Sequence, residues 1–299
     1  MKYNPSYVKL SKEDFQKRIE SLRSMMERCV ICPHCCGVNR LKGEIGFCKA
    51  RDKVKISSCF PHFGEEDVLV GRHGSGTIFF SYCNLRCVFC QNYTLSQGIE
   101  GREVSTEELA MMMLKLKEQG CHNINLVSPS HYVPQIVEAI SMAASEGLNI
   151  PIVYNTGGYD SVAILKLLQD IIDIYMPDTK YMDEELGKKY SKIGNYPRVL
   201  KAGLKEMHRQ VGDLEIKDGL AVKGLLVRHL ILPNRLAGTK ELLQFISEEI
   251  STNTYINLMG QYYPTHEVYK YPELTRRATR EEVREAFEYA ETLGLDRVI

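Results

Sequence analysis

From residue 75 to the C-terminus, short apolar runs alternate with longer segments that have a single apolar stripe. The runs are apolar at nearly every position, which is typical of parallel strands covered on both faces. The segments between them have the spacing of amphipathic helices. This repetition of strand and helix indicates an α/β fold. The expected strands comprise residues 77–82, 123–127, 150–154, 172–176, 225–232 and 255–259.

Several helices between these strands have recognisable ends. Ser105 and Glu108 have the spacing of a capping box, and an apolar stripe follows before Gly120. Thr279 and Glu282 predict a second capped helix near the C-terminus. Further helices are expected around residues 133–140, 160–169 and 197–211, and after Thr239.

Six strands, each followed by a helix, predict six βα units, which is fewer than the eight that close a TIM barrel. We therefore expect residues 75–299 to form an open partial (βα)6 TIM-like barrel. A doubly wound open sheet is the alternative, because strand count and alternation are the same in both folds. Residues 1–74 are expected to form an N-terminal extension, in which one amphipathic helix after Ser11 precedes a Cys-rich, metal-binding stretch.

The charge of the chain argues against several classes of partner. Of 299 residues, 38 are Lys or Arg and 38 are Asp or Glu, so the formal net charge is zero. Such a chain lacks the general attraction to phosphate backbones or anionic lipid, and we expect neither nucleic acid nor membrane as a partner. No apolar run reaches the roughly 18 residues of a membrane helix. The first ten residues lack the apolar segment of a signal peptide, so a cytoplasmic location is expected.

Ten cysteines are many for a chain in a reducing compartment, and their spacing there indicates metal binding or catalysis. Cys83, Cys87 and Cys90 form a C-x3-C-x2-C motif directly after the first expected strand. Three thiolates from one loop can bind three irons of a [4Fe–4S] cluster and leave the fourth iron open. Active sites of barrels lie at the carboxyl ends of strands, which is where this loop begins. The alternatives are a zinc site with a fourth ligand from elsewhere, or three unrelated buried thiols.

This loop, with Phe89 before its last cysteine, resembles that of the radical S-adenosylmethionine (SAM) enzymes. Residues 74–81, 83–92, 154–160, 174–180 and 257–262 look more closely like the PflX-like branch, named for its similarity to pyruvate formate-lyase activating enzyme. The resemblance runs from about Cys29 to the C-terminus. It implies that SAM binds the open iron through its amino and carboxylate groups. It also implies that reductive cleavage of SAM yields a 5′-deoxyadenosyl radical, which abstracts a hydrogen atom from the substrate.

The resemblance also suggests cofactor-binding residues after the second and third strands. Many relatives have a Gly-Gly-Glu motif after the second strand, whereas this chain has Ser128 and Ser130 there. Either serine is a candidate for the SAM amino group, and a cap on the next helix is the alternative. After the third strand, Thr156 and Gly157 offer a backbone that SAM can approach closely, unless they form an ordinary turn.

Charged residues follow the fourth strand and interrupt the fifth. Asp178 and Lys180 resemble the Asp-x-Lys of glycyl-radical activases, in which Lys180 would meet the SAM carboxylate and Asp178 would meet the ribose or orient the lysine. A surface ion pair is the alternative. Arg228 and His229 lie within an apolar strand, so at least one is expected to point into the barrel. A cation there needs an anionic partner, for which the SAM carboxylate or an acidic group of the substrate would serve. A satisfied structural role is the commoner outcome for His229.

The remaining cysteines can supply a second metal site in the N-terminal extension. Cys29, Cys32, Cys36 and Cys48 provide four thiolates, enough for a tetrahedral zinc ion or a second iron–sulfur cluster. Cys35 is an alternative ligand to Cys36, and the spacing does not separate zinc from iron–sulfur. Residues 61–66 connect the two groups of cysteines, and we expect them to form a solvated loop.

Three functions follow from these patterns. The leading one is a radical SAM activase that places a radical on a glycine of a partner protein, with flavodoxin or ferredoxin as the electron donor. The second keeps the chemistry but acts on a small molecule or a peptide. The third is a zinc-binding scaffold protein in which both cysteine groups are structural. No motif identifies a substrate, because the fold does not specify the residues that recognise it.

Overall fold

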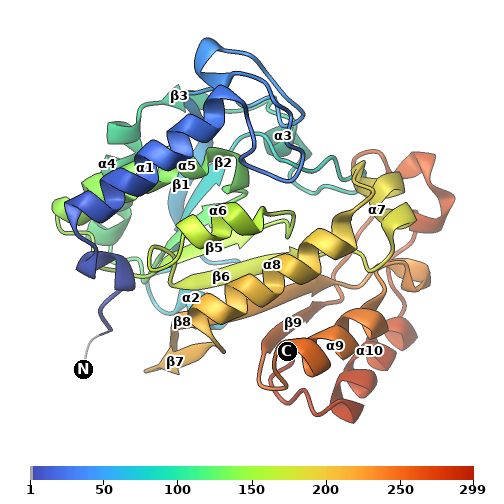
Figure 1. The fold of residues 1–299 in the computed structure, drawn as a ribbon. Coiled ribbons are helices and arrows are strands. Elements are labelled where there is room, and N and C mark those ends of the chain that lie inside the picture. The colour runs from blue at the N-terminus through green and yellow to red at the C-terminus, as the bar shows by residue number, and fades with distance from the viewer. Residues whose placement is uncertain (1–2) are drawn as a thin grey trace.

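The computed structural model describes residues 3–299, and a nine-stranded mixed sheet forms its centre (Figure 1). Six neighbouring strands of this sheet run parallel, in the same order as in the sequence. The sheet is not closed, because β9 pairs with β8 and forms no ladder with β2. The parallel strands are β2 (Ser75–Phe80), β4 (Ile124–Val127), β5 (Ile152–Thr156), β6 (Ile174–Thr179), β8 (Leu220–Leu230) and β9 (Tyr255–Met259).

Each of the six apolar runs in the sequence corresponds to one of these parallel strands, which confirms the α/β class. The strands follow one another without the reversal of order that a doubly wound sheet has at its centre. β8 begins at Leu220, earlier than the apolar run, because its first residues form an antiparallel hairpin with β7 (Glu215–Lys217).

Two further strands extend the sheet beyond β2 and were not predicted. β1 (Val54–His62) pairs antiparallel with β2, and β3 (Arg102–Val104) pairs antiparallel with β1. Most residues of β1 are only partly buried, so its sequence lacks the continuous apolar run of a central strand. The expected boundary between an extension and a barrel at residue 74 stays a prediction, and β1 lies in the same sheet as the strands that follow it.

The predicted capping boxes begin two helices, α4 (Thr106–Glu118) after Ser105 and α10 (Arg280–Thr292) after Thr279. A third capping box, in which Ser11 pairs with Asp14, begins the expected N-terminal helix. The other helices are α1 (Lys12–Glu27), α2 (Asp67–Val70), α3 (Tyr93–Ser96), α5 (Val133–Ser145), α6 (Val162–Leu167), α7 (Glu184–Ser191), α8 (Tyr196–Val211) and α9 (Thr239–Glu249). Short 3-10 turns comprise Ser6–Lys9, Arg40–Lys42, Ser130–Tyr132, Pro233–Arg235, Val268–Lys270 and Pro272–Leu274.

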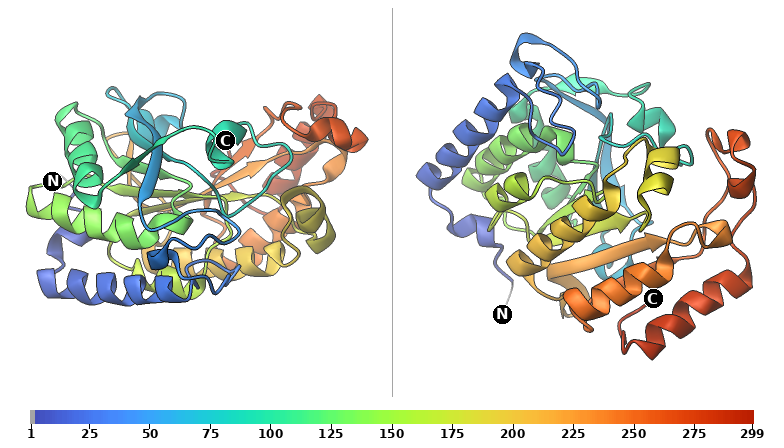
Figure 2. Two further views of the ribbon diagram at one scale, coloured as in Figure 1. Left: turned by 90° about the horizontal axis from the view of Figure 1, so that it is seen from above. Right: turned by 45° about the vertical axis from the view of Figure 1, so that its right-hand side comes forward.

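The helices pack on one face of the sheet, and the site lies on the opposite face. α6 and α8 lie across β5 and β6, and α1 packs against α5 (Figures 1 and 2). Phe15, Leu22 and Met26 of α1 are buried in the same apolar core as the central strands, so the N-terminal helix is part of this core. Within residues 3–299, the structure has no helix of sufficient length and apolar character to cross a membrane.

Candidate functional site

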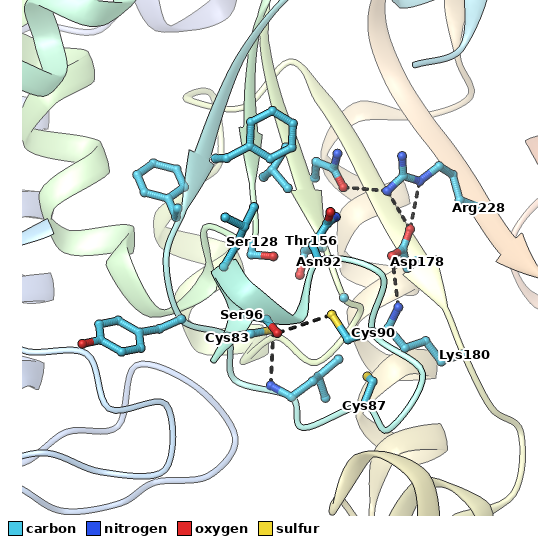
Figure 3. Close-up of a pocket in the computed structure, with 18 residues that line it drawn as sticks. Cys83, Cys87, Cys90, Asn92, Ser96, Ser128, Thr156, Asp178, Lys180 and Arg228 are labelled. Carbon is cyan, nitrogen blue, oxygen red and sulfur yellow. Dashed lines mark hydrogen bonds and ion pairs between the residues drawn. The ribbon is translucent and has the colours of Figure 1, made fainter. Parts of the chain in front are cut away.

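Three cysteines lie together at the carboxyl end of β2. Cys83, Cys87 and Cys90 line a cavity of about 140 Å³, which we call the cysteine cavity (Figure 3). Tyr82, directly before this loop, has a φ of 72°. Its amide donates to the carbonyl of Leu95 at 2.8 Å, and its ring occupies the space where a side chain on Gly98 would lie. This left-handed turn takes the chain out of β2 and into the cysteine loop.

Each of the three sulfurs has a hydrogen-bonding neighbour. These are the amide of Leu85 at 3.4 Å from Cys83, Ser191 Oγ at 2.9 Å from Cys87 and Ser96 Oγ at 3.3 Å from Cys90. Burial raises the pKa of Cys83 to about 12 and the pKa of Cys87 to about 11. Both groups are therefore neutral thiols at physiological pH until a metal displaces the proton.

A network of buried charges faces the cysteines from the neighbouring strands. Lys180 Nζ donates to Asp178 Oδ2 at 3.0 Å, and Arg228 Nε donates to Asp178 Oδ1 at 2.8 Å. Asp178 and Arg228 are partners in the register between β6 and β8, which brings the side chains together. All three side chains line the cysteine cavity, so Arg228 is the one of the two basic residues of β8 that faces it.

Electrostatics keep all three groups ionised. Burial alone would raise the pKa of Asp178, but the charges of Arg228 and Lys180 outweigh it and lower this pKa to about 2. Burial would likewise lower the pKa of Lys180, but attraction to Asp178 raises it above its usual value. Within the lining of the cysteine cavity, Lys180 and Arg228 are the two cations beside the single carboxylate of Asp178, so this side of the site suits an anionic group of a cofactor.

A second cavity of about 780 Å³, which we call the large cavity, shares part of this lining. Arg228 Nη1 donates to Glu65 Oε2 at 3.0 Å, and Asn257 Nδ2 donates to Glu66 Oε1 at 2.9 Å. The expectation of a solvated loop at residues 61–66 is wrong in this part, because Glu66 is buried and the Glu65 side chain is only 7% exposed. The glutamates turn inward because basic and amide partners lie on β8 and β9.

The residues predicted after β4 and β5 also lie near the cysteines. Ser128, Thr156 and Gly157 all line the cysteine cavity. Ser128 has a φ of 59°, a conformation that costs energy for a residue other than glycine and that recurs at binding sites. A Cβ on Gly157 would lie 2.6 Å from Leu85 of the cysteine loop, so glycine allows this loop to approach β5.

Ser130 is not among the residues that line either cavity. Its hydroxyl donates to Asp160 Oδ1 at 2.6 Å and lies 3.1 Å from Thr156 Oγ1. The position of Ser130 in the turn before α5 therefore stabilises the end of β5, and a direct contact with SAM stays an untested prediction.

Comparisons with known proteins agree with this geometry. A sequence model of the radical SAM superfamily matches residues 77–222. A protein of Methanocaldococcus jannaschii described as "Uncharacterized protein MJ0674" is 34% identical over 300 residues, which cover 97% of this chain and 81% of that protein. The chain belongs to the radical SAM superfamily. A second protein of the same organism, "Uncharacterized protein MJ0808", is 25% identical over 85% of this chain and 75% of its own length.

One solved structure, at low sequence identity, shows the same fold. The FeFe-hydrogenase maturase HydG from Carboxydothermus hydrogenoformans superposes with a TM-score of 0.51 and 12% identity, over 73% of this chain and 50% of HydG. Streptococcus suis SuiB bound to SAM has a TM-score of 0.49 and 15% identity, over 70% of this chain and 44% of SuiB. This radical SAM chain therefore spans only about half of the length of these solved structures.

Membership of the radical SAM superfamily implies a [4Fe–4S] cluster and SAM, and the residues present fit both groups. Three thiols from one loop, with Cys87 buried and Cys83 and Cys90 partly buried, line a single cavity, and each has a hydrogen-bonding neighbour. Within residues 3–299 no three His, Cys, Asp or Glu side chains converge on the position of a single metal ion. In a cubane each thiolate binds a different iron, so its ligands are more widely spaced than those of one ion.

Phe89 and His229 differ in their surroundings. Phe89 is buried, packs edge-on against Tyr181 and Tyr262, and lines the large cavity. His229 is fully buried, and its Nε2 lies 2.9 Å from Thr239 Oγ1 while its Nδ1 lies 2.8 Å from the carbonyl of Thr179. Burial lowers the pKa of His229 to about 4, so the neutral ring has the structural role given above as the alternative.

The N-terminal cysteines lie near one another, beside the cysteine loop. Cys29, Cys32 and Cys48 are buried, Cys36 is partly buried, and Cys35 is exposed. Burial, together with repulsion from the other three of this group, raises the pKa of Cys32. Cys36, rather than Cys35, therefore belongs with the three buried cysteines.

Contacts join this region to the loop of the radical SAM motif. His34 Nε2 lies 2.9 Å from the carbonyl of Asn84, and Arg86 Nη2 donates to the carbonyl of Phe47 at 2.8 Å. The His34 and Phe47 rings stack with their centroids 3.9 Å apart. These contacts of the N-terminal extension therefore stabilise the position of the cysteine loop.

Sequence reasoning missed several polar residues that line the cavities. Asn155 accepts from Arg228 Nη2 at 2.8 Å, and Asn257 binds Glu66. Both asparagines interrupt an apolar strand, which is the signal that identified Arg228, and the same criterion would have found them. Glu65 and Glu66 carry no such signal, because the strand before them is only partly apolar.

Proposed function

We propose that this protein binds a [4Fe–4S] cluster through Cys83, Cys87 and Cys90, binds SAM beside it, and acts on a substrate in the large cavity. The observation that carries this proposal is the single cavity that the three thiols share with the charged side chains of Asp178, Lys180 and Arg228. When bound, the cluster and SAM supply a 5′-deoxyadenosyl radical for hydrogen abstraction.

The protein's own residues position and shield these groups. Lys180 and Arg228 present their charges to the SAM carboxylate, and Asp178 holds both in place through its two oxygens. Ser128 and Thr156 offer hydroxyl groups at the ends of neighbouring strands. The unclosed sheet with six parallel strands is consistent with a partial TIM barrel, in which the site lies at the carboxyl ends of the strands.

For the substrate we retain two proposals. An activase of a glycyl-radical protein, with flavodoxin or ferredoxin as the electron donor, is supported by the PflX-like resemblance of residues 178–180 and by the gap between β9 and β2, through which a loop of the partner would enter. A small-molecule or peptide substrate is supported by the size and polar lining of the large cavity. A protein that copurifies and gives a glycyl-radical signal by electron paramagnetic resonance would favour the activase.

We also propose a second metal site, with Cys29, Cys32, Cys36 and Cys48 as ligands. Arg40 is buried, and its charge opposes the effect of burial on the pKa of Cys48, which is nevertheless raised. A cation near Cys48 suits an anionic metal–thiolate group. Zinc and iron–sulfur are the two candidates: a zinc ion would require these thiols to move closer together, because no three ligands converge on one ion within residues 3–299, and elemental analysis separates the two.

The enzyme is tested by anaerobic purification, iron and sulfide analysis, and detection of 5′-deoxyadenosine after reduction with SAM. We expect about four irons per cluster and SAM cleavage in the wild type. Cys87→Ala should abolish cleavage, whereas Cys59→Ala should retain it, because Cys59 lies in β1 and lines neither cavity. Zinc without iron, together with no cleavage of SAM, would instead support the scaffold function. Cleavage by the Cys87→Ala variant would contradict the assignment of this site.

A further inference from the structure

The large cavity lies where the sheet is not closed. Its walls include Tyr255, Asn257 and Met259 from β9, and Glu65 and Glu66 from the segment between β1 and α2. No ladder joins β9 to β1 or β2, so side chains rather than backbone pairs fill this side of the molecule. The cavity continues to Cys87 and Cys90, which also line the cysteine cavity, so a molecule bound in it reaches the cysteines.

Glu66 has an incomplete set of partners within this wall. The residue is 7% exposed, and its Oε1 accepts from Asn257 Nδ2 at 2.9 Å. Its Oε2 is buried and has no hydrogen-bond partner among the described residues. A buried carboxylate oxygen without a donor is unfavourable, so this position favours a ligand that supplies one.

The cations near Glu66 already have carboxylate partners. Arg228 pairs with Glu65 and Asp178, and Lys180 pairs with Asp178. His62 Nδ1 lies 3.6 Å from Glu65 Oε1. The carboxylates that line the large cavity, Glu65, Glu66, Asp67 and Asp178, outnumber its two full cations, Lys180 and Arg228. The charge of this cavity is therefore complementary to a cationic ligand.

We propose that Glu66 binds an ammonium or guanidinium nitrogen of the substrate, a proposal that rests on the proposed function and names its substrate class. The nitrogen donates to the free Oε2, which completes the partners of the carboxylate. Apolar side chains of Leu230, Leu232 and Met259 line the same cavity and contact the carbon skeleton. The opposite end of the substrate then lies toward Cys87 and Cys90.

A titration with three ligands of similar shape tests this site. We choose pentylamine, 1-pentanol and pentanoate, and follow each by ligand-observed NMR with the anaerobically reconstituted protein. The protonated amine should bind about tenfold more tightly than the alcohol, because only the amine forms a charge-assisted hydrogen bond, and pentanoate should bind least. An amine that binds no better than the alcohol to the wild type would overturn the proposal without any variant.

Variants then assign the preference to Glu66. Glu66→Gln keeps the shape and the contact with Asn257, and should lower the affinity for pentylamine about tenfold, to the level of the alcohol. Glu13→Gln is the control, because Glu13 is exposed on α1, where its only ion-pair partner in the described residues is Lys17. Circular dichroism checks that both variants fold. Unchanged amine affinity in Glu66→Gln would refute the assignment.

SAM itself has an ammonium group, so a second experiment distinguishes a substrate site from the SAM site. The pentylamine titration is repeated with saturating SAM. Retained affinity supports a substrate site beside SAM, whereas competition would assign the cation site to SAM and overturn the proposal. Cleavage of SAM is measured on the same preparations. Cleavage without amine preference would refute only this inference, and amine preference without cleavage would refute the proposed function while supporting the Glu66 site.

Discussion

Replacement of Asp178 by Asn tests the reasoning about the buried charges most directly. The amide keeps the size of the side chain but removes the negative charge between Lys180 and Arg228. Arg228 retains Glu65 and Asn155, whereas Lys180 has no other ion-pair partner in the part of the chain that the structure describes. Lys180 is 17% exposed and therefore bears most of the loss.

The magnitude follows from the pKa of Asp178, which falls from 3.8 to about 2 in the folded protein. At about 1.36 kcal/mol for each pKa unit, this difference corresponds to roughly 2.4 kcal/mol in favour of the folded state. The side chain is 27% exposed, so solvent screens part of the interaction. We expect Asp178→Asn to lower the free energy of unfolding by about 2 kcal/mol at pH 7.

The assay is anaerobic urea unfolding followed by circular dichroism. Asp170→Asn is the matched control, because Asp170 is exposed and its positive φ suits Asn equally well, so a change within about 0.5 kcal/mol is expected. In a double-mutant cycle with Lys180→Met, the two effects should be less than additive, since each removes the same ion pair. Additive effects, or wild-type stability of Asp178→Asn, would refute the account of this network.

Three further predictions concern the turn after β5, the buried carboxylate of Asp173 directly before β6, and the cysteines of the N-terminal extension. Gly158→Ala should destabilise the protein by about 2 kcal/mol or more in urea unfolding. The φ of Gly158 is 76°, and a Cβ there would lie 2.6 Å from the carbonyl oxygen of residue 178. Gly194→Ala is the control and should not change the stability, because a Cβ at Gly194 would meet open space. Burial raises the pKa of Asp173 from 3.8 to about 6, so the wild type should lose about 2 kcal/mol relative to Asp173→Asn as the pH rises from about 4 to 6.5, and a constant difference would contradict this. Cys36→Ala should remove the N-terminal metal by elemental analysis and Cys35→Ala should retain it, since only Cys36 lies among the buried thiols, and the opposite result would exchange their roles.

Much of the fold follows from periodicity alone. All six parallel strands have mainly apolar sequences, and the capping boxes at Ser105 and Thr279 locate two helix starts. β1 and β3 escaped prediction because both are partly exposed and have mixed sequences, and β3 is only three residues long. α7 is only eight residues long, and its apolar positions are too few to stand out.

The candidate site was also predicted only in part from the sequence. Local sequence was sufficient for Cys83, Cys87 and Cys90, because thiolates for one cluster come from one loop with short spacing. It also indicated Asp178, Lys180 and Arg228, since charges at strand ends or within apolar strands are unusual. It did not reveal that Asp178 and Arg228 form a pair, because their contact depends on the register of β6 against β8.

The amino-acid sequence by itself therefore determined the order of the six parallel strands and the cysteine motif, because both depend on spacing over a few residues. Only the tertiary structure decided which charges meet, since ion pairs such as Arg228 with Glu65 join residues far apart in the chain. It also decided that Glu66 is buried with a free oxygen beside the cavity. Burial and partner choice arise from packing between distant segments, and no local pattern encodes them.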